Sequence, residues 1–439
     1  MAERYTIKTA VFASGERFPM LVDVRTGVPL FDATSYILSE VRGRNRASAT
    51  IEAVLRALKI FQLFCDPRPN RFNTEQRSDE RGIDLTERMR SGKLLTMGEL
   101  DELTMWCRLP LSEIEAKLHE SPVAVRSVSV SLETYRARPT AAPPEVAGDS
   151  AGVRIRYIRD FIEWLVDRRY LSLGAQHPTA ATLRDAKDIV VSGLTARIPS
   201  GRDRNKAKNR KALDESVQDR LWQIIAVDSP VNPWKSRHSR VRNELIVRWF
   251  VGLGLRRGEL LGVQVRDVDF RKCEVFIARR PDDLNDPRLH EPNTKTFDRE
   301  LPISDDLARR THLYIVKERQ LYPAARKHPF LFVANGGAPL SLRGLNAIFM
   351  ALRQKHPDLP NIFPHLLRHT NNYNFSNIAD KLGMSPAVEA KTRSQMMGWS
   401  ETSGTAATYT RREIERKARE ASLQLQNKMV EPRNPENDI

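Results

Sequence analysis

The chain has 439 residues, enough for two or three domains of ordinary size. It carries 71 Lys and Arg against 55 Asp and Glu, a formal net charge of +16, so a polyanion is the first partner to consider. Its three widely spaced cysteines and the lack of an apolar run of about 20 residues argue against a disulfide scaffold, a structural zinc site, secretion and a membrane span. Composition alone favours an intracellular protein that binds nucleic acid.

The N-terminal part predicts an extended segment followed by a helical domain. Residues 1–34 alternate loosely between apolar and polar types, which indicates short strands or an arm. From Arg46 onward apolar residues recur at helical spacing until the helix ends before Pro67. A second such face begins at Ile158. The polar, proline-containing stretch between the two helices predicts loops and insertions rather than core. We expect a helical domain over residues 35–195.

A basic segment, residues 196–212, separates the two halves of the chain. From Arg197 to Lys211 its net charge is +6. Such a run is typical of a solvated linker, and in a basic protein it also suits contact with a phosphate backbone. The candidate DNA-binding residues are Arg202, Arg204, Lys206, Lys208, Arg210 and Lys211.

Residues 213–425 read as a second domain. The pattern is helical to Leu255, then predicts short strands around Val268–Phe270, Glu274–Ile277 and Glu300–Ile303, then helices again. The fold class expected is mainly α with a small antiparallel sheet, α+β. Residues 426–439 predict a polar tail.

The first candidate motif is Gly254-Leu-Arg256-Arg-Gly-Glu259-Leu260. A glycine-broken turn presents Arg256, and Glu259 lies one helical turn later, where its carboxylate can orient the guanidinium. The same residues also suit an ordinary surface helix start. Nucleotide-binding glycine loops and the HExxH zinc helix are missing from the sequence.

The second candidate motif is Pro364-His365-Leu-Leu-Arg368-His369-Thr370. Residues three apart share a helix face, so His365 and Arg368 can converge on one ligand, with His369 and Thr370 turned elsewhere. An ordinary core helix would show the same sequence pattern.

Taken in chain order, the two motifs and the residues that follow them resemble the tyrosine recombinase (phage integrase) family over about residues 213–425. The resemblance implies a catalytic set, with Glu259 in support: Arg256, Lys295, His365, Arg368, Trp399 and Tyr409. The sequence departs from the family pattern in three places. A long segment at 279–291 precedes the strand that follows Lys295, the sequence between His369 and Gly398 is polar and atypical, and one extra residue lies between Trp399 and Tyr409. Tyr373 is a weaker candidate for the nucleophile.

The resemblance also implies what the protein does. Residues 35–195 would be a core-binding (SAM-like) domain that clamps duplex DNA opposite the catalytic domain. The chain would be a site-specific recombinase or integrase that joins DNA through a 3′-phosphotyrosyl link, with neither ATP nor a metal as cofactor. Its partners would be double-stranded DNA and three further copies in a homotetramer on paired sites, with a monomer or weak oligomer when free. A cytoplasmic, nucleoid-associated setting in a prokaryote or mobile element follows. The alternatives are a relaxase like the type IB topoisomerases and a non-catalytic DNA-binding regulator.

Overall fold

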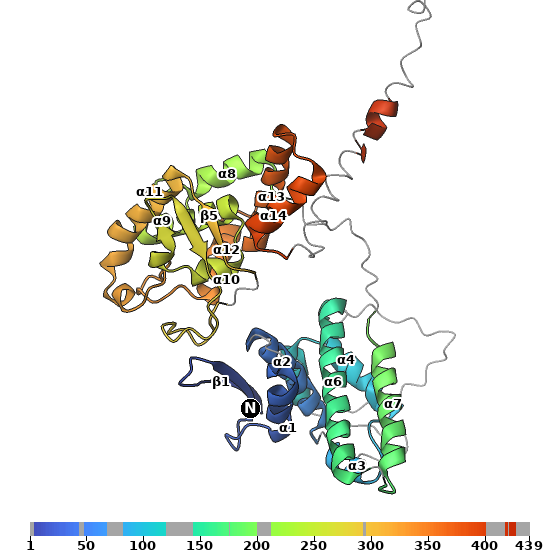
Figure 1. Ribbon diagram of the computed structural model, residues 1–439. Helices are drawn as coiled ribbons and strands as arrows, with labels where there is room; N and C mark the ends of the chain where they lie inside the picture. Colours follow the sequence, from blue (N-terminus) through green and yellow to red (C-terminus); the bar gives the residue numbers. More distant parts are fainter. Residues whose placement is uncertain are drawn as a thin grey trace, which may run out of the picture. The chain divides into compact units, whose positions relative to one another are not determined.

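The computed structural model describes residues 4–43, 48–67, 82–119, 144–174, 176–199, 212–292, 296–400, 418–419 and 421–426. The chain divides into two compact units, one made by residues 1–12 with 17–207 and the other by residues 13–16 with 208–439. Each unit has its own ribbon body in Figure 1 and its own hydrophobic core. Among the described helices, none combines the length and apolarity that crossing a bilayer requires.

The first unit begins with an antiparallel hairpin of two strands. Strands β1 (Tyr5–Val11) and β2 (Arg17–Asp23) pair in a register that places Tyr5 opposite Asp23 and Val11 opposite Arg17. Phe18 and Leu21 on β2 are buried in the helical core, so the hairpin packs against the helices of this unit (Figure 1). The expected extended segment is therefore a hairpin.

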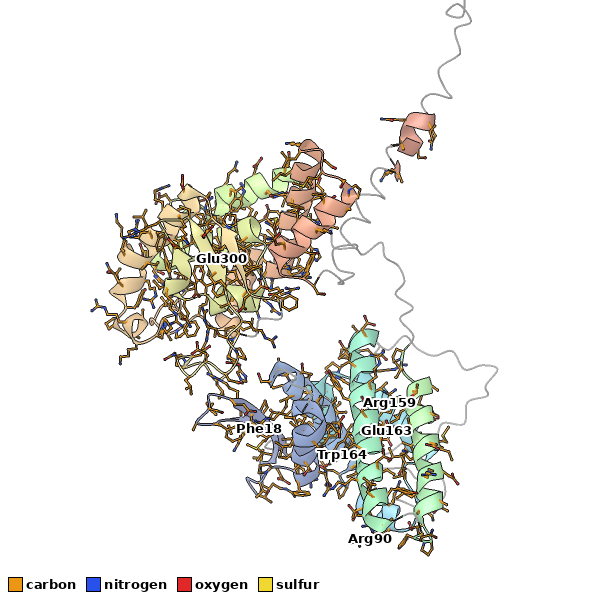
Figure 2. All side chains as sticks on the ribbon, viewed as in Figure 1. Phe18, Arg90, Arg159, Glu163, Trp164 and Glu300 are labelled. Carbon is orange, nitrogen blue, oxygen red and sulfur yellow. The ribbon has the colours of Figure 1, made fainter. Side chains whose placement is uncertain are left out.

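Helices form the rest of this unit. In chain order they are α1 (Phe31–Tyr36), the π-helix η1 (Ile37–Arg42), α2 (Ser48–Cys65), α3 (Leu85–Arg90), α4 (Met97–Arg108), α5 (Leu111–His119), α6 (Gly148–Leu173) and α7 (Ala180–Ala196). An aromatic cluster joins α1 to α6, because the Tyr36 ring lies 5.3 Å from both Phe161 and Trp164. Figure 2 shows Trp164 beside Glu163 and Arg159 on α6.

The expectation of loops between the first two predicted helices is wrong for residues 82–119. Helix α4 begins with a capping box, in which Thr96 accepts from the backbone of Glu99 at 3.3 Å and Glu99 accepts from the backbone of Thr96 at 2.8 Å. Leu100, Leu103 and Cys107 follow at helical spacing and are fully buried. The polar composition of the stretch concealed a cap and an apolar face that together specify a core helix.

The second unit alternates helices with a small sheet. In chain order its elements are α8 (Glu215–Ile225), α9 (Arg237–Leu253), α10 (Arg257–Gly262), η3 (Val265–Asp267), β3 (Val268–Asp269), β4 (Glu274–Ile277), β5 (Arg299–Pro302), α11 (Asp305–Lys317), η4 (Arg319–Leu321), η5 (Pro323–Lys327), α12 (Leu342–Lys355), α13 (Pro364–Lys381) and α14 (Pro386–Met397). The described part of the chain is thus mainly helical with small antiparallel sheets, as the sequence predicts.

The sheet of the second unit has the order β3-β4-β5 with both pairs antiparallel. Each strand lies within one residue of its predicted range. Val275 and Leu301 face each other and are buried, which fixes the register of β5 on β4. The entry to β5 therefore has a defined position, and Arg299 is its first residue.

Helix α9 runs through the core of this unit. Its apolar face buries Ile246, Trp249 and Phe250, and the Trp249 ring meets Phe332 edge-on at 5.7 Å. The indole N–H of Trp249 donates to Thr311 on α11 at 3.2 Å, so a polar group inside the core is paired. This packing fixes the position of the C-terminal end of α9, where the candidate site begins.

Candidate active site

The turn between α9 and α10 depends on a glycine. Gly254 ends α9 with φ of 60°, in the left-handed region. A Cβ added there would lie 2.5 Å from Oδ1 of Asn371 and 2.7 Å from Cε of Met397, so any side chain would displace these two residues. Asn371 in turn donates to the carbonyls of Val251 and Gly252 at 2.7 and 3.0 Å, which satisfies carbonyls at the end of α9. Helix α13 is thereby locked against this turn.

Arg256 follows directly and stands at the start of α10. Its backbone N–H donates to Oε2 of Glu259 at 2.9 Å, and its guanidinium donates to Oε1 at 3.3 Å. The carboxylate therefore fixes both the main chain and the side chain of Arg256. The expected orientation of Arg256 by Glu259 is confirmed, and the arginine side chain keeps 31% of its surface exposed.

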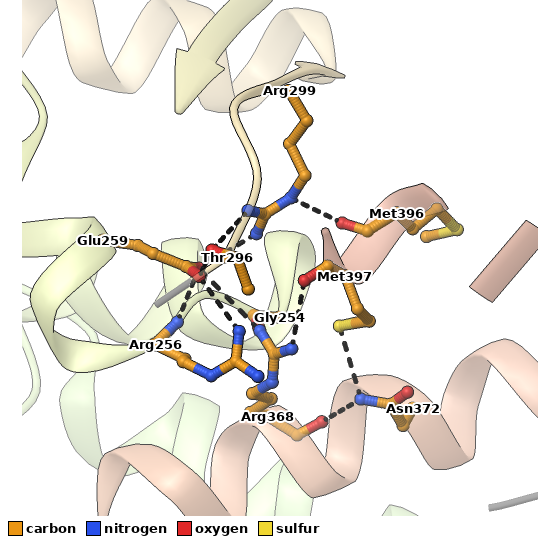
Figure 3. Close-up of polar contacts among 9 residues, drawn as sticks. All are labelled: Gly254, Arg256, Glu259, Thr296, Arg299, Arg368, Asn372, Met396 and Met397. Carbon is orange, nitrogen blue, oxygen red and sulfur yellow. Dashed lines mark hydrogen bonds and ion pairs between the residues drawn. The ribbon is translucent and has the colours of Figure 1, made fainter. Parts of the chain in front are cut away.

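Glu259 is the centre of the site, as Figure 3 shows. It is buried, and three arginines from different elements surround it. Arg299 donates to Oε2 at 2.9 Å, Arg368 lies 3.8 Å from the same oxygen, and Arg256 contacts Oε1. Thr296 also donates to Oε1. Four side chains separated by up to 112 positions in sequence thus meet at one carboxylate.

The pKa of Glu259 reflects these neighbours. Burial of the carboxyl raises its pKa, but the charges of Arg299 and Arg368 and the hydrogen bonds from Arg299 and Thr296 outweigh burial and lower the pKa from 4.5 to about 2. Glu259 is consequently ionised at neutral pH. It offsets part of the positive charge that would otherwise repel the guanidinium groups from one another.

Helix α13 carries the predicted His365 and Arg368. Arg368 is buried, donates to the carbonyls of Gly254 and Met397, and has its guanidinium 5.3 Å from the centre of the Trp399 ring. His365 is exposed at the start of the same helix. Arg256, Arg368 and Trp399 are therefore brought together, with His365 one turn from Arg368.

The expectation for His369 is wrong. Its ring lies 4.5 Å from that of His365 in an edge-on contact, because residues four apart share a face of a helix. Thr370 is directed into the core, where its hydroxyl accepts from the backbone of Leu213 at 3.1 Å. The two histidines form one pair at the N-terminal end of α13.

Trp399 is placed by the end of α14. Gly398 ends this helix with φ of 63°, and a Cβ added to it would lie 2.8 Å from Nη1 of Arg299. The backbone N–H of Trp399 donates to the carbonyl of Ser394 at 2.9 Å. The indole nitrogen is buried, so donation from its N–H to a phosphate would require the ring to move.

Several predicted residues lie outside the described residues. They are Lys295, Tyr409 and the linker set Arg202, Arg204, Lys206, Lys208, Arg210 and Lys211. Their roles stay predictions. The weaker nucleophile candidate, Tyr373, is described and is exposed on α13. Five residues correspond to a turn of about 140° around a helix, so Tyr373 is directed away from the side of α13 that carries Arg368.

Sequence reasoning missed Thr296 and Arg299. Neither belongs to a motif visible in the sequence, and a lone arginine at the start of a short strand is unremarkable in a chain with 71 basic residues. Only the folded chain brings them to Glu259. Within the described residues, no group of three or more His, Cys, Asp or Glu side chains is arranged to hold a metal ion.

Comparison with known proteins finds one matching family profile and several relatives of similar sequence. The sequence profile described as "Phage integrase family" matches residues 213–416. Tyrosine recombinase XerC of Bacillus subtilis is 25% identical over 162 residues, which cover 36% of this chain and 46% of that protein. Tyrosine recombinase XerC of Vibrio campbellii is 27% identical over 167 residues, 38% of this chain and 45% of that protein. The matched region spans about half the length of these curated relatives.

A comparison with solved structures gives a weaker likeness. The Tn1549 transposon integrase in complex with a circular intermediate DNA has a TM-score of 0.46 and 16% sequence identity, over 88% of this chain and 98% of that chain.

Proposed function

We propose that the protein is a site-specific DNA recombinase or integrase of the phage integrase family, because residues 213–416 match the profile of that family and resemble the tyrosine recombinases. The observation that carries the proposal is the meeting of Arg256 and Arg368 at Glu259, with Trp399 beside Arg368 and His365 one helical turn away. These are the described members of the ordered set that the family motif requires.

The two arginines suit attack at a phosphodiester. Charge develops on the non-bridging oxygens as the phosphorus is attacked, and a guanidinium can hold those oxygens with paired N–H donors. Arg256 is accessible as it stands. Arg368 is 2% exposed, so a phosphate reaches it only after the groups that cover it have moved. DNA binding would therefore have to open the side of the site next to Trp399.

Tyr409 is the proposed nucleophile. A free tyrosine has a pKa of about 10, so only about one in a thousand is ionised at pH 7. Lowering that pKa by three units takes roughly 4 kcal/mol, which clustered cations and a base such as His365 can supply. The phenol oxygen would bond to phosphorus while the 5′ oxygen departs, and Lys295 would protonate it.

The product would be a 3′-phosphotyrosyl protein and a free 5′-hydroxyl. The covalent link conserves the energy of the phosphodiester, so a second 5′-hydroxyl reverses the attack without ATP. We infer that four copies on two duplexes of DNA each cut one strand, with residues 35–195 as the second half of the clamp. The basic charge of the whole chain suits this substrate.

A nicked suicide duplex tests the function. Wild-type protein should form a covalent protein–DNA adduct that survives denaturation and maps to the peptide containing Tyr409. Tyr409→Phe should bind the same DNA with unchanged affinity and form no adduct.

Other outcomes identify the alternatives. Adduct formation that leads to plasmid relaxation by a monomer without sequence preference would indicate a relaxase. Specific, salt-sensitive binding with no adduct from the wild type would indicate a regulator.

A further inference from the structure

Arg299 is a buried arginine at the centre of the site that the family motif leaves without a role. It opens β5, and its side chain is 6% exposed. We propose that Arg299 is a positioning residue for DNA cleavage. It holds Glu259 at a fixed distance from the end of α14, and Glu259 in turn orients Arg256 and Arg368. This inference rests on the proposed function.

The guanidinium of Arg299 reaches three separate groups. Nη2 donates to Oε2 of Glu259 at 2.9 Å, Nη1 to the hydroxyl of Thr296 at 3.2 Å, and Nε to the carbonyl of Met396 at 2.8 Å (Figure 3). The partners belong to α10, to the segment before β5 and to α14. One rigid planar group thus sets the spacing of three elements, which a lysine with its single ammonium group could not do.

The end of α14 packs closely against Arg299 and the segment before β5. Gly398, at the end of α14, approaches so near that a Cβ would lie 2.8 Å from Nη1 of Arg299 and 3.0 Å from the carbonyl of Phe297. The backbone N–H of Phe297 also donates to the carbonyl of Gly398 at 3.2 Å. The end of α14 therefore moves only if Arg299 moves, and Trp399 follows Gly398 directly.

The distances around Glu259 also rank its three arginines. Arg299 makes the shortest contact, at 2.9 Å, while Arg256 stands at 3.3 Å and Arg368 at 3.8 Å. A carboxylate that is already paired by Arg299 attracts the other two guanidinium groups less. Arg256 and Arg368 are thus oriented by Glu259 without being held by it as closely as Arg299 is. Without Arg299, Glu259 would bind them more tightly and draw them away from the reacting phosphorus.

Nε, Nη1 and Nη2 of Arg299 all donate to groups of the protein, which assigns this residue to positioning rather than to phosphate contact. Its loss should therefore slow the chemical step and leave DNA affinity nearly unchanged. A displacement of about 1 Å at a reacting centre can lower a rate about 100-fold.

The experiment uses the full-length protein and two suicide duplexes. One has the natural 5′ oxygen at the cleavage site, and the other has a bridging sulfur there, which departs as a thiolate and needs no proton. We expect Arg299→Met to form the adduct about 100-fold more slowly on both duplexes, with a Kd for DNA within about threefold of the wild type. Arg309→Met, an exposed arginine on α11 paired with Asp306, is the matched control and should react at the wild-type rate.

The sulfur duplex separates two ways in which the rate can fall. If Lys295 is the general acid, Lys295→Ala should recover most of its lost rate on sulfur, whereas Arg299→Met should not, because its defect lies in holding the phosphate. Recovery of Arg299→Met on sulfur, or a wild-type rate on both duplexes, would overturn the inference. A wild type that forms no adduct would instead remove the proposed function.

A second variant applies if Arg299→Met does not fold. Thr296→Val keeps the shape of the side chain but removes the hydroxyl that donates to Glu259 and accepts from Arg299. We expect its adduct formation to slow about tenfold on both duplexes, because the change removes one hydrogen bond that holds Glu259 and one that holds Arg299. A wild-type rate in a folded Thr296→Val would also overturn the inference.

Discussion

Glu259 shows how one buried side chain determines the properties of several others. A carboxylate is costly to bury unless it is paired, and here it has two arginines and a threonine within hydrogen-bond distance and a third arginine close by. Because the positive charges outweigh the burial, the pKa of Glu259 falls rather than rises. The residue serves both the stability of the fold and the geometry of the site.

This arrangement predicts how stability depends on pH. A carboxyl whose pKa is lowered in the folded state stabilises it above the unfolded pKa, here 4.5, and the contribution is lost as pH falls toward about 2. We expect the free energy of unfolding of the wild type to exceed that of Glu259→Gln by a margin that shrinks by about 2 kcal/mol between pH 6 and pH 3. Urea unfolding of both proteins across this range measures it. A margin that stays constant would contradict the pairing described.

At the scale of elements, the site is held by helix ends that meet without intervening side chains. Gly254 ends α9 where Asn371 of α13 and Met397 of α14 approach it, and Gly398 ends α14 against Arg299. Farther along, Arg393 of α14 is fully buried and donates to the carbonyl of Asn372 on α13 at 3.0 Å. These contacts fix α9, α13 and α14 to one another and so fix the side chains they carry.

The two glycines of the α9 and α10 ends give a matched test. Gly254→Ala should lower the free energy of unfolding by about 2 kcal/mol or more, because the left-handed backbone is strained with a Cβ and the methyl group meets Asn371. Gly262→Ala, eight residues later, has open space around its Cβ position and should change stability by less than about 1 kcal/mol. Chemical denaturation of both variants measures the contrast, and equal effects would refute the close approach.

For the whole molecule, charge determines the kind of partner. A net charge of +16 on 439 residues produces a long-range attraction to polyanions that does not depend on any one contact. The predicted linker concentrates part of this charge in residues 196–212, of which 200–211 lie outside the described residues. Its contact with the DNA backbone stays a prediction.

Neutralising the linker tests that contact. Replacing Lys206, Lys208, Arg210 and Lys211 by Gln should weaken binding to all DNA sequences alike, because phosphate contacts carry no sequence information. If all four contact phosphates, the slope of log K against log salt should become less steep by up to about 4. Titrations between 50 and 300 mM salt, roughly the range in which such slopes are measured, provide the value. An unchanged slope would place the linker away from the backbone.

Local order along the chain was enough to predict much of this protein. Helical spacing, strand alternation, the pairing of Arg256 with Glu259 and the shared helix face of His365 and Arg368 depend on neighbours within a few residues, so they can be predicted from the sequence. The three strands of the second unit and the orientation of Arg256 by Glu259 were predictable for that reason. The loops expected between residues 67 and 144 failed in part because polar residues on α4 outnumber the few that make its buried face.

The fold alone decided which distant side chains meet. Arg299 contacts Glu259 across 40 positions and Met396 across 97, and no local pattern marks a pair so far apart. Whether an arginine is buried beside a carboxylate or left in solvent depends on how helix ends and a strand pack, since burial is a property of the assembled core. Sequence therefore determined which chemical groups are present and their order, and tertiary packing determined that three arginines share one buried charge.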